Sequence, residues 1–124
     1  MGKGLGNLQR AILLVAYEKY MRNSAAYVSA REILIGYYGF PTNGKPLNRY
    51  SSSLVFDRRV IGFRRYMSAS VTIVQCFNRL MVRGFVERDV GHGIRLTRAG
   101  AKQARELCAV DSIVLTDVFN VIHN

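Results

Sequence analysis

The alternation of apolar and polar residues predicts two helices in the first third of the chain. From about Leu5 to Arg22, apolar side chains recur at three- and four-residue steps with charged residues between them, which indicates an amphipathic helix. Ser29-Ala-Arg-Glu32 then has the sequence of a capping box, in which the serine hydroxyl and the glutamate carboxylate each accept from a backbone N–H at a helix start. We expect this second helix to end near Gly39, ahead of Pro41.

The middle of the chain is less regular. Residues 41–53 carry no periodic pattern, and although Asn43-Gly44 is a turn signal, no alternating strand leads into it. We therefore predict a loop here rather than a hairpin. Residues 54–63 are ambiguous and could hold a short helix near Ser53–Arg59.

The pattern becomes strong again in the last half of the chain. It predicts a helix from Ser70 to Arg83, with Ser68 or Ser70 as its N-cap and Gly84 just beyond its end. Segments 85–89 and 93–97 alternate like strands around a glycine-bearing turn, and Thr97 can cap a further helix. Residues 110–124 are rich in Val, Ile, Leu and Phe and could form a helix or a strand. The fold class is thus mainly α with a small β-hairpin.

Charge adds the first indication of a partner. The chain has 124 residues, enough for one domain with a core, and its 18 Lys+Arg against 8 Asp+Glu give a net charge of +10. Such an excess favours a polyanionic partner. Residues 41–84 hold eight basic residues and only Asp57 as an acid, whereas residues 85–124 are neutral. We expect the middle of the chain to face the anion.

Several classes of protein are not favoured. Cys76 and Cys108 lie in apolar helical patterns, which is typical of buried thiols in a reduced, cytoplasmic protein, with a redox switch as the alternative. No metal-ligand spacing links them to His92 or His123, and neither a signal peptide nor a membrane-length apolar run is found. No histidine lies near a nucleophile in the sequence, and no paired carboxylates are seen. We expect no enzyme, no cofactor and no metal.

Two motifs carry a resemblance to a known family. They are Arg79-Leu-Met-Val-Arg-Gly-Phe-Val-Glu-Arg88 and Leu96-Thr-Arg-Ala-Gly100. Residues 68–104 resemble the winged helix-turn-helix transcriptional regulators, in particular the MarR-like group. The resemblance implies a DNA-binding domain over residues 1–109, with helix 70–83 in the major groove of double-stranded DNA and the 85–97 hairpin as the wing. Residues 41–67 depart from the family as a long basic insertion before the recognition helix.

The residue types of the predicted helix and its neighbours suit DNA. Asn and Gln can pair with adenine, Arg with guanine, and Ser or Thr with phosphate or base edges. On the recognition helix, the candidate contacts are Ser68, Ser70, Thr72, Gln75, Asn78 and Arg79. In the insertion they are Arg58, Arg59, Arg64 and Arg65, and in the wing they are Arg88, His92 and Arg95.

Each of these candidates has a plainer interpretation. The polar residues could form an ordinary solvated helix face, His92 could be a simple turn residue, and some arginines could stack on Tyr50, Phe56, Phe63 or Tyr66. Val71 and Val74 interrupt the polar face. They could contact thymine methyl groups, or the assumed helical register could be off by one.

The apolar C-terminal segment suggests self-association. We expect a homodimer formed by the first helix and residues 110–124, because two-fold symmetry would set two recognition helices one turn of DNA apart. The alternatives are an architectural or RNA-binding winged helix without base readout and a winged-helix protein-interaction module. The sequence identifies no small-molecule effector.

Overall fold

The structure is a computed structural model that describes residues 5–46, 49, 54–89 and 91–109. It is mainly helical with two small antiparallel sheets, which confirms the predicted fold class at this level. In chain order the elements are α1 (Asn7–Arg22), α2 (Ala30–Gly36), β1 (Thr42–Pro46), β2 (Leu54–Phe56), α3 (Arg58–Ile61), α4 (Phe63–Val82), β3 (Val86–Asp89) and β4 (Gly93–Leu96). A further helix covers residues 98–109.

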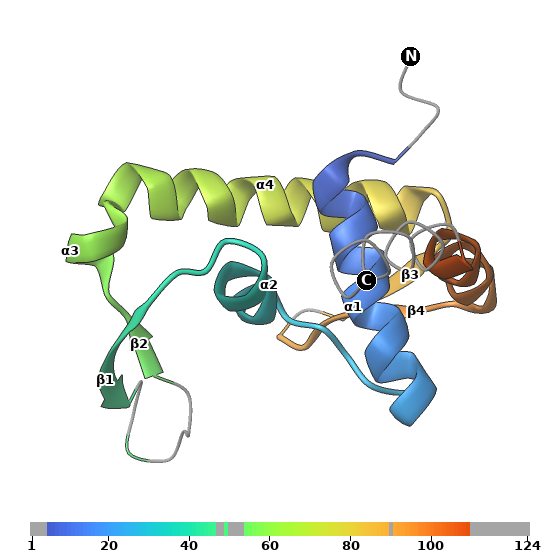
Figure 1. Ribbon diagram of the computed structural model, residues 1–124, viewed down its shortest axis with the longest axis horizontal. Coiled ribbons are helices and arrows are strands. Elements are labelled where there is room, and N and C mark those ends of the chain that lie inside the picture. The colour runs from blue at the N-terminus through green and yellow to red at the C-terminus, as the bar shows by residue number, and fades with distance from the viewer. Residues whose placement is uncertain (1–4, 47–48, 50–53, 90, 110–124) are drawn as a thin grey trace, which may run out of the picture.

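Helix α4 is the axis of the molecule. Its 20 residues make it roughly 30 Å long, and the other elements are arranged along it (Figure 1). One end adjoins α3 and the β1–β2 pair, and the other end lies beside α1 and the β3–β4 hairpin. The side of α4 that faces the core carries residues at three- and four-residue spacing, as the periodicity predicted: Ala69, Ile73, Cys76, Phe77 and Leu80.

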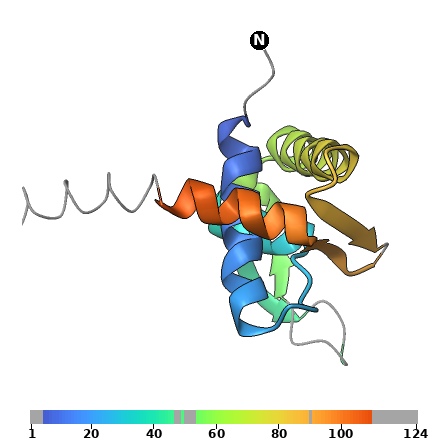
Figure 2. The ribbon, with the colours of Figure 1, turned by 90° about the vertical axis from the view of Figure 1, so that its right-hand side faces the viewer.

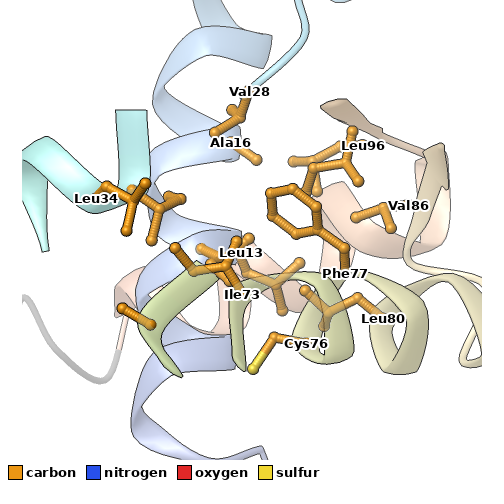
Figure 3. Packing of buried hydrophobic residues seen from close by; sticks show 14 of the residues in the cluster. Leu13, Ala16, Val28, Leu34, Ile73, Cys76, Phe77, Leu80, Val86 and Leu96 are labelled. Carbon is orange, nitrogen blue, oxygen red and sulfur yellow. The ribbon is translucent and has the colours of Figure 1, made fainter. Parts of the chain in front are cut away.

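The core lies where α1, α2, α4 and the β3–β4 hairpin meet (Figure 3). Ile73 and Leu80 of α4 are fully buried there, together with Leu13 of α1 and Ile94 of β4. The helix over residues 98–109 crosses α1 and closes this core with Ala101 and Ala104 (Figure 2). We call α1, α2, residues 71–82 of α4, β3–β4 and residues 98–109 the body.

Strand β4 has a partner on each side. It pairs antiparallel with β3, where Val86 lies opposite Leu96 and Arg88 opposite Ile94. On its other side it forms a bridge with Val28, whose N–H and C=O bond to Ile94 at 2.7 and 2.9 Å. Gly93 has a positive φ of 107°, and a side chain there would overlap the backbone of Val28. The segment before α2 is thereby tied to the hairpin.

The predicted helix signals at Ser29 and Gly84 are confirmed. Ser29 and Glu32 form the reciprocal capping box at the start of α2. At the end of α4, the amide of Gly84 donates to Met81 O and the amide of Phe85 donates to Leu80 O, with Gly84 at φ 79°. These two bonds form a Schellman motif, which satisfies carbonyl groups that the helix end leaves free.

The Leu-Thr-x-x-Gly motif joins the last helix to the end of α4. The Thr97 hydroxyl accepts from the Gly100 amide at 3.1 Å, so Thr97 caps the helix as predicted, and it donates to Gly84 O at 2.6 Å. A side chain at position 100 would overlap the carbonyl group of Phe85. The motif therefore has a structural reason, which is the close approach of the helix over residues 98–109 to the turn after α4.

The predicted loop over residues 41–53 is wrong in part. Strand β1 pairs antiparallel with β2, with Thr42 opposite Phe56 and Pro46 opposite Leu54 and an irregular register between them. The short helix expected near Ser53–Arg59 is also displaced. The chain at 54–56 is a strand, and the helix α3 begins only after Asp57, whose carboxylate accepts from the Val60 amide.

The predicted start of the recognition helix is wrong as well. Helix α4 begins at Phe63 rather than Ser70, and its N-cap is Gly62 with no side-chain cap. The insertion of residues 41–67 therefore ends inside this helix. We call β1, β2, α3 and residues 63–70 of α4 the outer arm.

The predicted dimer elements are only partly described. Residues 110–124 lie outside the described residues. In α1, the buried residues Ile12, Leu13 and Ala16 pack within their own chain. No described helix combines the length and the apolar character that a membrane crossing requires.

Candidate nucleic-acid interface

The exposed side of α4 carries basic residues near both ends of the helix and no acid. The helix contains three arginines, Arg64, Arg65 and Arg79, and no acidic residue. All three side chains are exposed, as are those of Ser68 and Gln75. This side of the helix can therefore approach a polyanion without bringing a carboxylate near it.

The six predicted recognition residues do not share one face. Because successive helical residues are turned by about 100°, Ser70 and Thr72 lie about 160° apart around the axis. Both are half-buried, and their hydroxyls donate within the helix, to Tyr66 O at 2.9 Å and Ser68 O at 2.8 Å. Neither hydroxyl is an N-cap, and Ser70 is turned toward the core side. Ser68, Gln75 and Arg79 remain as exposed polar groups.

Asn78 and Arg88 are brought together across the helix–hairpin boundary. A guanidinium N–H of Arg88 donates to Asn78 Oδ1. A bidentate pair with adenine needs both the oxygen and the NH₂ of an asparagine, so this bond competes with the adenine contact predicted for Asn78. In this arrangement Asn78 positions Arg88 beside α4.

The other two predicted wing residues are paired with acids. Arg95 Nε donates to Glu87 Oε2 at 2.9 Å, and its guanidinium lies 5.3 Å from the ring centre of Tyr27. Since side chains alternate along a strand, Arg95 and Arg88 lie on opposite faces of the hairpin. His92 Nδ1 lies 3.1 Å from Asp89 Oδ2.

The four insertion arginines divide into two pairs. Arg58 stacks over the ring of Tyr66 at 4.9 Å and Arg65 over that of Phe40 at 5.2 Å. The ring stacking that the sequence left open is therefore correct for Arg58 on Tyr66. Arg59 and Arg64 are exposed, and within the described ranges neither makes an ion pair, a hydrogen bond or a ring contact. Their charges are available to a ligand.

Arg31 is a basic residue that sequence reasoning missed. Its guanidinium lies 4.6 Å from the ring centre of Phe56 and donates to Leu54 O, so it holds β2 against α2. Phe56 in turn contacts the ring of Tyr66, with 5.5 Å between centroids. The only available signal was the position of Arg31 two residues after the capping serine, which did not reveal that its partner Leu54 lies 23 residues away.

A hollow of about 320 Å³ lies between α4, the start of α2 and the hairpin tip. Val74 and Phe77 of α4 line one side, and Arg88 and His92 line another. A larger hollow of about 920 Å³ lies between the start of α1 and the end of α4, with Arg79 and Arg83 in its wall. Both hollows are next to the basic side of α4.

Sequence reasoning also missed an exposed apolar row on α4. Phe63, Met67, Val71 and Val74 are all exposed on successive turns. The signal was present in the two valines that interrupted the expected polar face. Because α4 begins at Phe63, the row extends two turns further toward the N-terminus than the predicted helix did. Val71 and Val74 are exposed, so the helical register that placed them on the outer face is correct.

The two cysteines differ in their surroundings. Burial raises the pKa of the Cys76 thiol, with Arg79 acting against that shift, so Cys76 is held as a neutral thiol. Both cysteines are free, and Cys108 is half-buried rather than buried as expected. Within the described part of the chain, no group of three or more His, Cys, Asp or Glu could hold a metal ion.

Comparison with known proteins gives no match: neither a family model, nor a curated protein, nor a solved structure is similar to this chain.

Proposed function

We propose that the chain binds double-stranded DNA as a winged helix-turn-helix protein and acts as a transcriptional regulator. In this proposal α4 enters the major groove, α2 supports it, and the β3–β4 hairpin is the wing. The element order supports it, as does the bridge between Val28 and Ile94, which places a third extended segment beside the hairpin.

The observation that carries the proposal is the charge of one continuous surface. Along α4 the exposed side has arginines and no acid, Arg59 precedes it in α3, and Arg88 joins it through Asn78. Phosphate groups supply most of the affinity in protein–DNA complexes, and each contact releases counterions. A surface of this composition attracts a polyanion such as DNA.

The proposal assigns different tasks to the two ends of α4. Arg59 and Arg64 are exposed near its start and would contact phosphates on one side of the groove. Arg88 lies near its other end, roughly 20 Å away along a helix that rises about 1.5 Å per residue, and would contact the backbone on the other side. Gln75 lies between them and would face base edges.

The test is a double charge reversal, Arg59→Glu with Arg64→Glu. Both side chains are exposed and without partners in the part of the chain described, so the variant should keep its circular dichroism spectrum and melting temperature. We expect its affinity for a labelled duplex to fall by roughly a hundredfold or more, because two charge-assisted contacts of about 1.5–3 kcal/mol each are lost. Fluorescence anisotropy measures the loss.

Arg98→Glu is the matched control. Arg98 is exposed at the start of the helix over residues 98–109, outside the surface of α4, Arg59 and Arg88 that is assigned to DNA, and an acid is favourable at a helix N-terminus. The control should change affinity less than about threefold, as expected for an exposed charge outside the contact surface that salt screens. Equal losses in both variants, or none in either, would contradict the assigned surface.

Regulation requires sequence preference, which competition measures. A sequence-specific regulator should stay bound to its selected site in the presence of an excess of random duplex. An architectural protein should be displaced as readily by random duplex as by unlabelled duplex of the selected sequence. Dimerisation stays a prediction, and light scattering at micromolar concentration checks it.

A further inference from the structure

The exposed apolar row on α4 has no role in the core. Phe63, Met67, Val71 and Val74 are 63%, 45%, 51% and 37% exposed. At about 100° per residue they fall within a stripe about 80° wide along four turns. The side chains that build the core lie on the opposite side of the helix. Contiguous exposed apolar surfaces often mark binding sites, whereas single exposed apolar residues are common and need no explanation.

The charge around the row limits what can cover it. Arg64 lies between Phe63 and Met67 in the sequence, Arg65 is next to it, and α4 holds no acid. A second α4 packed on this row would bring like charges together. A convex, basic ridge with apolar side chains along it instead fits a concave, anionic groove with apolar groups on its floor.

We propose, on the basis of the proposed function, that this row reads thymine methyl groups in the major groove. Thymine is the base that presents a methyl group there, on the floor of a groove lined by phosphates. Met67, Val71 and Val74 contact the methyl groups. Gln75, exposed and about 40° around the helix from Val71, pairs with adenine. Both chemistries select A·T base pairs.

The proposal predicts how much affinity each methyl contact contributes. Burial of one methyl group is worth about 0.8 kcal/mol, which corresponds to about a fourfold change in affinity. Two contacted methyl groups together give roughly fifteenfold. Replacing thymine by uracil removes only the methyl group and keeps the hydrogen-bonding pattern of the base pair.

The probes are four duplexes of about two helical turns each. Two contain A·T pairs in mixed order between G·C ends, one with thymine and the other with uracil. The other two contain G·C pairs in mixed order, one with cytosine and the other with 5-methylcytosine. We expect binding about tenfold or more weaker to the uracil duplex than to the thymine duplex, as for about two lost methyl contacts. The 5-methylcytosine duplex should bind more tightly than its unmethylated form, because it carries a methyl group at the same position.

The double variant Val71→Ser with Val74→Ser tests the row itself. Its thymine-to-uracil ratio should fall close to one while binding to the G·C duplex persists, and Met67→Gln should reduce the ratio in the same direction. Val15→Ser is the matched control, since Val15 on α1 is 38% exposed. It should keep the ratio of the parent protein.

The outcomes separate this inference from the proposed function. Equal affinity of the parent protein for the thymine and uracil duplexes overturns thymine readout and leaves DNA binding in place. An unchanged ratio in the Val71 and Val74 variant also overturns it. Failure to bind any of the four duplexes overturns the proposed function itself.

Discussion

The body and the outer arm are held together by different interactions. In the body, the largest fully buried side chains come from α1, α2, α4 and β4, and glycines allow backbones to touch at Gly93 and Gly100. In the outer arm, strand β1 is mostly exposed, and three arginines stack on Phe40, Phe56 and Tyr66. The body is thus held by close packing, whereas in the arm arginines stack from outside on aromatic rings, of which Phe40 and Phe56 are buried.

This difference matters for function because it separates the two roles of arginine. Arg31, Arg58 and Arg65 hold the arm in place, and Arg59 and Arg64 extend from it without a partner among the described residues. Substitutions at the second set should alter binding and leave folding intact. Substitutions at the buried positions of the body should do the reverse.

The largest effect on stability is expected at Gly100 in the body. Gly100→Ala places a methyl group against the Phe85 carbonyl, and overpacking of this kind costs about 3 kcal/mol. Gly36→Ala in α2 is the control, because a side chain there meets nothing and alanine favours a helix by about 1 kcal/mol. Urea unfolding measures both. Equal stability of the two variants would contradict the close approach of the last helix to the turn after α4.

A smaller effect is expected in the outer arm. Phe56→Leu removes the ring that contacts Arg31 and Tyr66, and we expect a loss of about 1–2 kcal/mol, confined to the arm. Phe63→Leu is the control in the same region, since Phe63 is exposed and should change stability by less than about 0.5 kcal/mol. Hydrogen exchange shows where protection is lost. Equal loss of protection in the body would mean that arm and body unfold as one unit.

The smallest effect concerns pH and the start of α2. Desolvation raises the pKa of Glu32, but hydrogen bonds from Lys19 and Ser29 outweigh it and leave the pKa lowered. A lowered pKa in the folded state stabilises the protein above the unfolded value of about 4.3, and this stabilisation is lost as pH falls below it. Melting temperatures from pH 6 down to about pH 3 should therefore fall less steeply in Glu32→Gln than in the parent protein. Parallel curves would contradict the pairing.

Local signals in the sequence predicted the body well. The capping box at Ser29, the glycine after α4 and the Thr97 cap all act within a few residues, so their spacing is enough to place them. The start of α4 was missed because Gly62 caps it without a side chain, while Ser68 and Ser70 have the residue type of a cap. The Ser70 hydroxyl instead donates to Tyr66 O one turn back, and Ser68 is an exposed residue inside the helix.

The outer arm could not be predicted because its contacts join distant residues. Strand β1 has the sequence Thr-Asn-Gly-Lys-Pro, with no alternation, and it becomes a strand only through its pairing with β2. The same holds at the candidate site. Arg65 finds Phe40, Arg95 finds Tyr27 and Arg88 finds Asn78, so the sequence supplied the charges without showing which of them are engaged.

The most direct test of DNA binding is a titration of a labelled duplex with the unmodified protein at about 50 and 200 mM salt. With four or more phosphates contacted, the account predicts that log affinity falls against log salt with a slope of roughly −3.6 or steeper. That corresponds to a loss of about a hundredfold or more over this range. Absence of binding at the lower salt concentration, or affinity that does not change with salt, would contradict the account.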